Sequence, residues 1–151
     1  MNSVAIVTGA SQGIGRSTAI RLASAGAQPL VCDLDLSKAE SAAALVKTTL
    51  DRFGRIDALL NIAGAVTQID LFEMTDEQWR AGAELKLHGA RRLTILAWEA
   101  LKQSKGSVVF MSGSAALDPK PAFAAVAVIN AAITACQSVR RTGYSRRSPG
   151  Q

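Results

Sequence analysis

The chain has 151 residues, of which 48% are apolar and 19% charged; this composition fits one globular domain and excludes wholesale disorder. No apolar run reaches the ~20 residues that cross a bilayer, and the first seven residues lack the basic segment of a signal peptide. The net charge of +5 comes mostly from arginines in residues 140–151, so a solvated basic tail is expected there.

Few residues suit metal or nucleic-acid chemistry. Cys32 and Cys136 have no CxxC or Cys/His spacing, and His88, the single histidine, is expected at the surface or packed. We therefore expect free thiols in a cytoplasmic protein without a metal site. Tyr144 is the only aromatic residue among the tail arginines, which disfavours an interface with nucleic acid.

Short apolar runs alternate with amphipathic stretches, which is typical of βαβ units around a parallel sheet. In chain order, we expect a strand at 4–8, a helix at 13–25 ended by Gly26, and a strand at 29–33. A helix from a Ser37–Glu40 capping box to Phe53 and a strand at 58–62 follow. The last elements are a long helix from a Thr75–Gln78 capping box to about residue 102, a strand at 107–112 and a helix at 121–138.

A glycine-rich turn, residues 8–15 with the sequence Thr-Gly-Ala-Ser-Gln-Gly-Ile-Gly, joins the first strand to the first helix. Gly9 and Gly13 allow tight turns and the close approach of a pyrophosphate, and Gly15 allows the helix to pack near the sheet. The free N–H groups and the positive end of the helix dipole then face the phosphates. Asp33 ends the next strand, where an acid accepts hydrogen bonds from a ribose. An acid at this position repels a 2′-phosphate, so the sequence favours NAD over NADP.

The spacing Thr-Gly-x-x-x-Gly-x-Gly resembles that of classical short-chain dehydrogenase/reductases. Residues 54–64, Gly-Arg-Ile-Asp-Ala-Leu-Leu-Asn-Ile-Ala-Gly, resemble that family's G-x-x-D-x-L-x-N-N-A-G strand, with Ile62 replacing the second asparagine. Trp79 and Gly89 fit its long central helix, and residues 106–112 resemble the strand that carries its catalytic serine. The resemblance covers about residues 3–138 and implies an oxidoreductase of alcohols or carbonyls with a nicotinamide dinucleotide. The dinucleotide contacts expected are Thr8, Gly9, Ser11, Gln12, Gly13, Ile14, Gly15, Asp33, Asn61, Ala63 and Gly64.

The catalytic tetrad that the resemblance implies is absent at every position. The serine, asparagine, tyrosine and lysine positions hold Gly113, Lys86, Val126 and Asn130, respectively. A valine cannot transfer a proton, so ordinary family catalysis is not expected. The remaining candidates are Lys86, which could act as a base if desolvated, and Ser112 and Ser114, which flank the serine position.

Residues 34–56 have room for one helix, where the family has a helix, a strand and a helix. The lost strand would carry an Asp-Val pair that contacts adenine, so weaker dinucleotide binding is implied. The remaining helix, residues 38–53, is long enough to cross from the second strand past the first to the next. We therefore expect a shortened α/β, Rossmann-like, doubly wound sheet of about four parallel strands in the order 2-1-3-4. This domain would span 1–139, with strand two as an exposed edge and 140–151 as a basic tail.

Three functional hypotheses remain open. The first is an NAD(H)-binding protein with impaired catalysis, regulatory through a homo-oligomer; the small apolar residues at 122–136 suit either docking on another copy or burial on the sheet. The second is an active oxidoreductase that uses Lys86 with Ser112 or Ser114. The third is a truncated or frameshifted relic, because the helical periodicity stops near residue 139.

Overall fold

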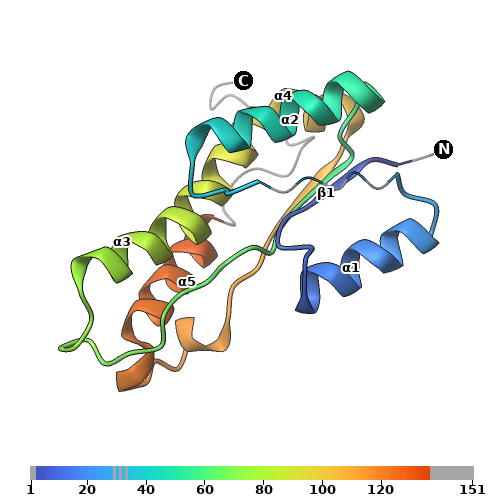
Figure 1. The fold of residues 1–151 in the computed structure, drawn as a ribbon. Coiled ribbons are helices and arrows are strands. Elements are labelled where there is room, and N and C mark those ends of the chain that lie inside the picture. Colours follow the sequence, from blue (N-terminus) through green and yellow to red (C-terminus); the bar gives the residue numbers. More distant parts are fainter. Residues whose placement is uncertain (1–2, 29, 31, 33, 137–151) are drawn as a thin grey trace, which may run out of the picture.

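The fold is built on a parallel sheet, seen in a computed structural model that describes residues 3–28, 30, 32 and 34–136 (Figure 1). Within these residues the strands β1 (Ala5–Val7), β2 (Ala58–Asn61) and β3 (Ser107–Phe110) pair in the order β1-β2-β3. The register aligns Ile6, Leu59 and Val108 in one row, and the residues that follow each of them form the next row. Because side chains alternate along a strand, the two rows face opposite sides of the sheet.

Helices lie on both sides of the sheet, as the sequence predicts for a doubly wound α/β fold. In the described part of the chain, α1 (Gly13–Ser24) is alone on one side (Figure 1). The helices α2 (Ala39–Phe53), α4 (Ala90–Ser104) and α5 (Ala124–Cys136) lie on the other side. The connection from β1 to β2 therefore changes face between α1 and α2.

The hydrophobic core lies between the sheet and the helices α2 and α4. Ile6 and Leu59 pack there with side chains from both helices, including Leu45 and Leu93. The opposite side is thinly covered: α1 buries only Gly15, and Val109 of β3 remains 45% exposed. Ile14, at the start of α1, is 62% exposed.

Two of the predicted helix ends are glycines in the left-handed backbone region. Gly26 follows α1 with φ +91°, and Gly54 ends α2 with φ +70°. The Gly54 N–H donates to the Leu50 carbonyl across 2.8 Å, which satisfies a group that the helix end would leave unpaired.

The two predicted capping boxes have different outcomes. Thr75 caps α3 (Asp76–Ala83): its Oγ1 accepts from the Gln78 N–H at 3.3 Å, and Gln78 Oε1 accepts from the Thr75 N–H at 2.9 Å. The Ser37–Glu40 box is wrong, because α2 begins at Ala39 and Ser37 Oγ donates to the Asp35 carboxylate at 2.7 Å. The Ser37 hydroxyl thus bonds to the nearby Asp35 carboxylate instead of forming the hydrogen bond of a capping box.

The long central helix is continuous but changes its pitch. A π-helical turn, Glu84–Gly89, lies between α3 and α4. Two short 3-10 turns, Ser114–Ala116 and Pro121–Phe123, precede α5. Periodicity locates the helix but gives no sign of the wider turn, which matters for the position of Lys86 described below.

The strand predicted at 29–33 falls mostly on residues that the structure does not describe. Gln28 forms one parallel bridge with Val4, so the chain does run along the outer edge of β1. Leu30 and Cys32 have no strand conformation, and residues 29, 31 and 33 lie outside the described residues. The predicted order of the first, third and fourth strands is confirmed: these strands are β1, β2 and β3, and they pair in that order. The end of α5 beyond Cys136, the expected domain boundary at 139 and the basic tail also lie outside the described part of the chain.

Candidate dinucleotide-binding site

Thr8 anchors the start of the glycine turn. Its buried side chain accepts hydrogen bonds at Oγ1 from the N–H groups of Ile62 and Ala63, both at 2.9 Å. The same hydroxyl donates to the Leu60 carbonyl at 3.3 Å. These bonds join the carboxyl ends of β1 and β2 and fix the point at which the turn leaves the sheet.

The glycines bring the first helix unusually close to this turn. Gly9 and Gly13 have φ of +68° and +53°, a backbone region that disfavours residues with a side chain. A Cβ on Gly15 would lie 2.2 Å from the Gly9 carbonyl oxygen, and a Cβ on Gly9 would lie 3.0 Å from the Ala63 nitrogen. The backbone atoms of β1, the turn and α1 therefore pack in direct contact, which forms a cradle without side chains.

The open side of this cradle carries free backbone donors. Ser11, Gln12, Gly13 and Ile14 are exposed, and Gln12 caps α1 without a side-chain hydrogen bond. The first N–H groups of an α-helix have no carbonyl partner within the helix, and they carry the positive end of its dipole. This arrangement suits a phosphate or another anion.

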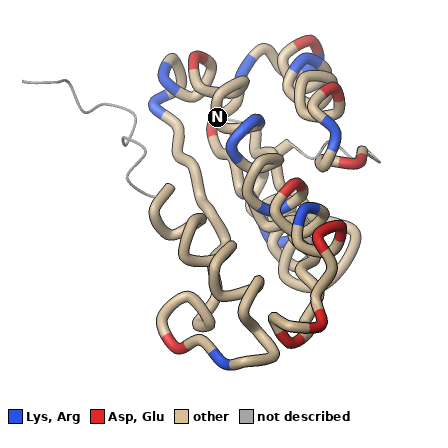
Figure 2. The backbone as a smooth tube through the Cα atoms, turned by 90° about the vertical axis from the view of Figure 1, so that its left-hand side faces the viewer, with Lys and Arg blue, Asp and Glu red and all other residues tan. Residues whose placement is uncertain are grey.

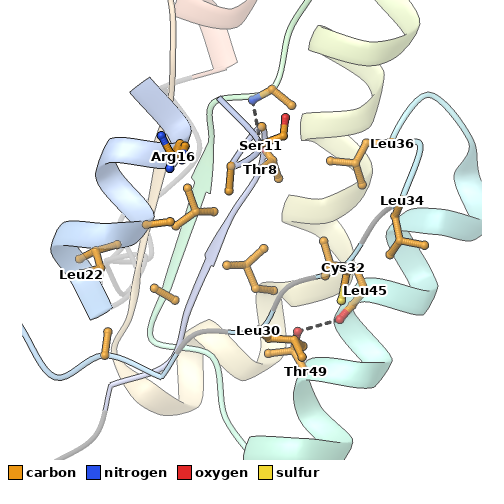
Figure 3. Close-up of a pocket in the computed structure, with 18 of the residues that line it drawn as sticks. Thr8, Ser11, Arg16, Leu22, Leu30, Cys32, Leu34, Leu36, Leu45 and Thr49 are labelled. Atoms are coloured by element: carbon orange, nitrogen blue, oxygen red, sulfur yellow. Dashed lines mark hydrogen bonds between the residues drawn. The ribbon is translucent and has the colours of Figure 1, made fainter. Parts of the chain in front are cut away.

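A cavity of about 790 Å³ extends from the glycine turn along β1, between α1 and residues that include Leu30, Cys32 and Leu34 (Figure 3). Thr8, Ser11 and Arg16 lie at one end, and Leu30 and Leu45 line the apolar far end. Sequence reasoning missed Arg16; its signal was a cation in the first turn of the helix that follows the glycines. This guanidinium adds a positive charge at the end of the cavity where the backbone donors lie.

The remaining residues predicted to contact the dinucleotide differ in whether they line this cavity. Ala63 lines the cavity, whereas Gly64 is exposed beside it. Asn61 is buried and turned toward α4, where its Nδ2 donates to Thr94 Oγ1 at 3.4 Å; its Oδ1 has no partner among the described residues. Asp33 lies outside the described residues, but Asp35 lines the same cavity.

The structure brings Lys86 and Asn130 together, although 44 positions separate them in sequence. Lys86 Nζ donates to Asn130 Oδ1 across 2.5 Å. Lys86 comes from the π-helical turn and lies over Gly64, and Asn130 comes from α5 and lies against Gly113. Burial lowers the pKa of the Lys86 ammonium.

Ser112, Ser114 and Val126, at or beside the serine and tyrosine positions, do not bond to the Lys86 side chain. Ser112 Oγ donates to the Asn130 carbonyl at 3.0 Å and contacts the Thr134 hydroxyl at 2.9 Å, so it holds α5 against the end of β3. Ser114 is exposed at the first residue of a 3-10 turn. Val126, at the tyrosine position, is half-buried and offers no exchangeable proton.

A second cavity, of about 710 Å³, lies beside the central helix. Exposed His88 lines it with Asp35, Trp79 and Glu84. No group of three or more His, Cys, Asp or Glu side chains in the described ranges could hold a metal ion, and both cysteines are free. Among the helices described, none has the length and apolar character that a membrane span requires.

Family models and curated proteins agree on one family. A model described as enoyl-(acyl carrier protein) reductase matches residues 29–143, and a model described as short chain dehydrogenase matches residues 3–44. The chain is 33% identical over 144 residues to a 3-oxoacyl-[acyl-carrier-protein] reductase of Synechocystis, covering 78% of this chain and 58% of that protein. It is 32% identical over 130 residues to an L-fucose dehydrogenase of Oryctolagus cuniculus, covering 72% of this chain and 46% of that protein.

Solved structures give the same result. A short-chain dehydrogenase from Streptomyces avermitilis is 26% identical with a TM-score of 0.87, covering 91% of this chain and 59% of that one. An alcohol dehydrogenase from Thermococcus sibiricus, complexed with 5-hydroxy-NADP, is 25% identical with a TM-score of 0.79, covering 89% of this chain and 68% of that one. The chain thus spans about half the length of the curated relatives it matches, 58% and 46% of the two above. On its fold and its motifs, it belongs to the short-chain dehydrogenase/reductase family.

Proposed function

We propose that this chain binds NAD(H) at the glycine turn and that its oxidoreductase chemistry is impaired. The observation that carries the proposal is the cradle made by Gly9, Gly13 and Gly15. Its backbone is so close-packed that a Cβ on Gly15 would lie 2.2 Å from a carbonyl oxygen. The exposed donors at the start of α1 and the nearby Arg16 suit the two phosphates of a dinucleotide.

The residues present fit each polar part of that ligand. The turn and Arg16 would hold the pyrophosphate, and Asp33 would accept hydrogen bonds from the adenosine ribose. When bound, a nicotinamide dinucleotide donates or accepts a hydride, chemistry that no side chain supplies. The protein would contribute binding, orientation and the exclusion of water.

Carboxylates near the expected adenosine position favour NAD(H) over NADP(H). Asp35 lines the cavity together with the turn. Hydrogen bonds from the Ser37 hydroxyl and N–H lower the pKa of Asp35, so this carboxyl is ionised at neutral pH. Together with Asp33 it would repel a 2′-phosphate.

Impaired catalysis follows from the tetrad positions. Val126 cannot donate or accept the proton that reduction of a carbonyl or oxidation of an alcohol requires. Ser112 is engaged with Asn130 and Thr134 on α5. The relatives named above are reductases and dehydrogenases, and we expect this chain to turn over such substrates far more slowly than they do.

A second copy of the chain is the partner we propose for this protein. Figure 2 shows α5 without acidic or basic residues, and Val128 on this helix is exposed. Ile95 and Leu96 of α4 are also exposed. Sedimentation equilibrium should detect a dimer that Val128→Lys dissociates; a monomer at all concentrations would remove this part of the proposal.

Fluorescence titration with NADH and NADPH tests the binding proposal. We expect saturable NADH binding that is tighter than NADPH binding, and Asp33→Arg should reverse this order. Asp51→Asn is the matched control, because Asp51 is an exposed acid on α2 that pairs with Lys47. No saturable NADH signal at millimolar concentration would remove the proposal.

A further inference from the structure

Residues 35–37 lie between the dinucleotide cavity and the central helix. Asp35 and Leu36 line that cavity together with Thr8 and Ser11 of the glycine turn. Figure 3 shows Leu36 at the end of the cavity that holds Thr8 and Ser11. Asp35, the adjacent residue, therefore brings a carboxylate close to the end where the phosphates are proposed to lie.

The backbone of residues 35–37 is in direct contact with the central helix. Leu36 is buried and belongs to the hydrophobic core. Its carbonyl oxygen lies so close to Gly89, the last residue of the π-helical turn, that a Cβ on this glycine would lie 2.7 Å from it. A side chain at position 89 would therefore push residues 35–37 away from the helix.

Arg92 of α4 holds the same residues against the helix. Its Nη1 donates to the Ser37 carbonyl at 3.1 Å, and its Nη2 forms an ion pair with Glu84 in the π-helical turn. The Arg92 side chain is only 27% exposed, so solvent and salt screen this pair less than a pair on the open surface. The rigid, planar guanidinium holds its two acceptors in a fixed geometry.

Ser37 connects Arg92 to Asp35. The Ser37 Oγ and N–H both donate to Asp35 Oδ1, at 2.7 and 3.0 Å. Ser37 thus bonds to Arg92 through its carbonyl group and to Asp35 through its other two polar groups. A continuous series of bonds therefore joins the central helix, through Glu84 and Arg92, to a carboxylate that lines the cavity.

We propose that Arg92 is a positioning residue for cofactor specificity, which holds the Asp35 carboxylate where it disfavours a 2′-phosphate. The inference rests on the proposed function, because it takes the adenosine end of the dinucleotide to lie beside Asp35. Arg92 is not among the described residues that line the cavity, so it acts through Ser37 and Asp35. Without Arg92, residues 35–37 would be held less firmly. The repulsion between Asp35 and a 2′-phosphate would then weaken, because it falls with distance.

The ratio of the NADPH and NADH dissociation constants, measured by calorimetry, tests this role. Arg92→Met combined with Glu84→Gln removes the ion pair without changing the net charge, and it should lower the ratio about threefold or more. Lys102→Met combined with Glu99→Gln is the matched control, because it removes an exposed ion pair of α4 with the same charge balance. It should leave the ratio within about 1.5-fold. Should the first combination unfold, Gly89→Ala displaces residues 35–37 without any change of charge, and it too should change the ratio.

The same substitutions in an Asp35→Asn chain test whether Arg92 acts through Asp35. Asparagine keeps an oxygen acceptor for Ser37 but has no charge, so Asp35→Asn alone should lower the ratio. Adding the Arg92 and Glu84 substitutions should then change the ratio by less than about 1.5-fold. An equal effect in both backgrounds, or an unchanged ratio in either the Arg92 or the Asp35 variant, would overturn the inference and leave NADH binding standing. A chain that binds neither nucleotide would overturn both.

Discussion

Gly15→Ala tests the close contact on which the cradle depends. The added Cβ would lie 2.2 Å from the Gly9 carbonyl oxygen, 2.6 Å from its carbon and 3.1 Å from the Thr8 oxygen. A relaxed C···O contact is about 3.3 Å or longer, so α1 must move roughly 1 Å away from the turn. All three obstructing atoms belong to the backbone, which cannot move aside as a flexible side chain can.

The expected cost is the difference between two effects. Overpacking of this kind costs about 1–3 kcal/mol, whereas alanine is a better helix former than glycine by about 1 kcal/mol. We therefore expect the free energy of unfolding to fall by up to about 2 kcal/mol. The NADH affinity should fall more than tenfold, because the displaced N–H groups no longer lie where the turn places the phosphates.

Urea unfolding followed by circular dichroism, together with NADH titration, measures both effects. Gly54→Ala is the matched control: Gly54 has φ +70°, a Cβ added to it would meet nothing within 4 Å, and it ends α2 far from the turn. It should cost about 1 kcal/mol through backbone strain and leave NADH binding unchanged. A Gly15→Ala protein as stable as the original chain and with the same NADH affinity would refute the close contact.

Three further substitutions probe the elements that hold the site. Thr8→Val should lower the free energy of unfolding by about 2 kcal/mol in urea, because two backbone N–H groups lose their acceptor, whereas Thr8→Ser should stay within about 1 kcal/mol. Hydrogen bonds from Arg55 hold the pKa of Asp57 below its usual range, so this stabilisation is present above the unfolded pKa of ~3.9 and is lost as the pH falls through the folded value. Asp57→Asn should therefore cost about 1 kcal/mol at pH 7 and flatten the acid limb of a stability-against-pH curve; an unchanged limb would contradict this. Thr75→Ala should cost about 1 kcal/mol, and equal unfolding midpoints would show that its bonds with Gln78 contribute nothing.

Local patterns predicted the fold well where one cause dominates. The apolar runs at 4–8, 58–62 and 107–112 predicted β1, β2 and β3, Gly26 and Gly54 predicted helix ends, and Thr75 with Gln78 predicted a helix start. Ser37 failed because the Asp35 carboxylate competes for its hydroxyl, a choice that depends on the turn geometry and not on the spacing.

The contact between Lys86 and Asn130 could not be predicted in the same way. It depends on how the π-helical turn and α5 pack against each other, which no local pattern encodes. The exchange of lysine and asparagine between two motif positions was nevertheless readable in the sequence. Next to the strand expected at 29–33, the structure shows a parallel bridge between Gln28 and Val4.

The thin packing of α1 has a consequence for hydrogen exchange. With Gly15 as its one buried residue, α1 can open locally without disturbing the core between the sheet and α4. Its amides should exchange with deuterium much faster than those of α4, although both segments are helical. A ligand held at the start of α1 would close this opening and slow the exchange, so the helix that receives the phosphates would also report when they are bound.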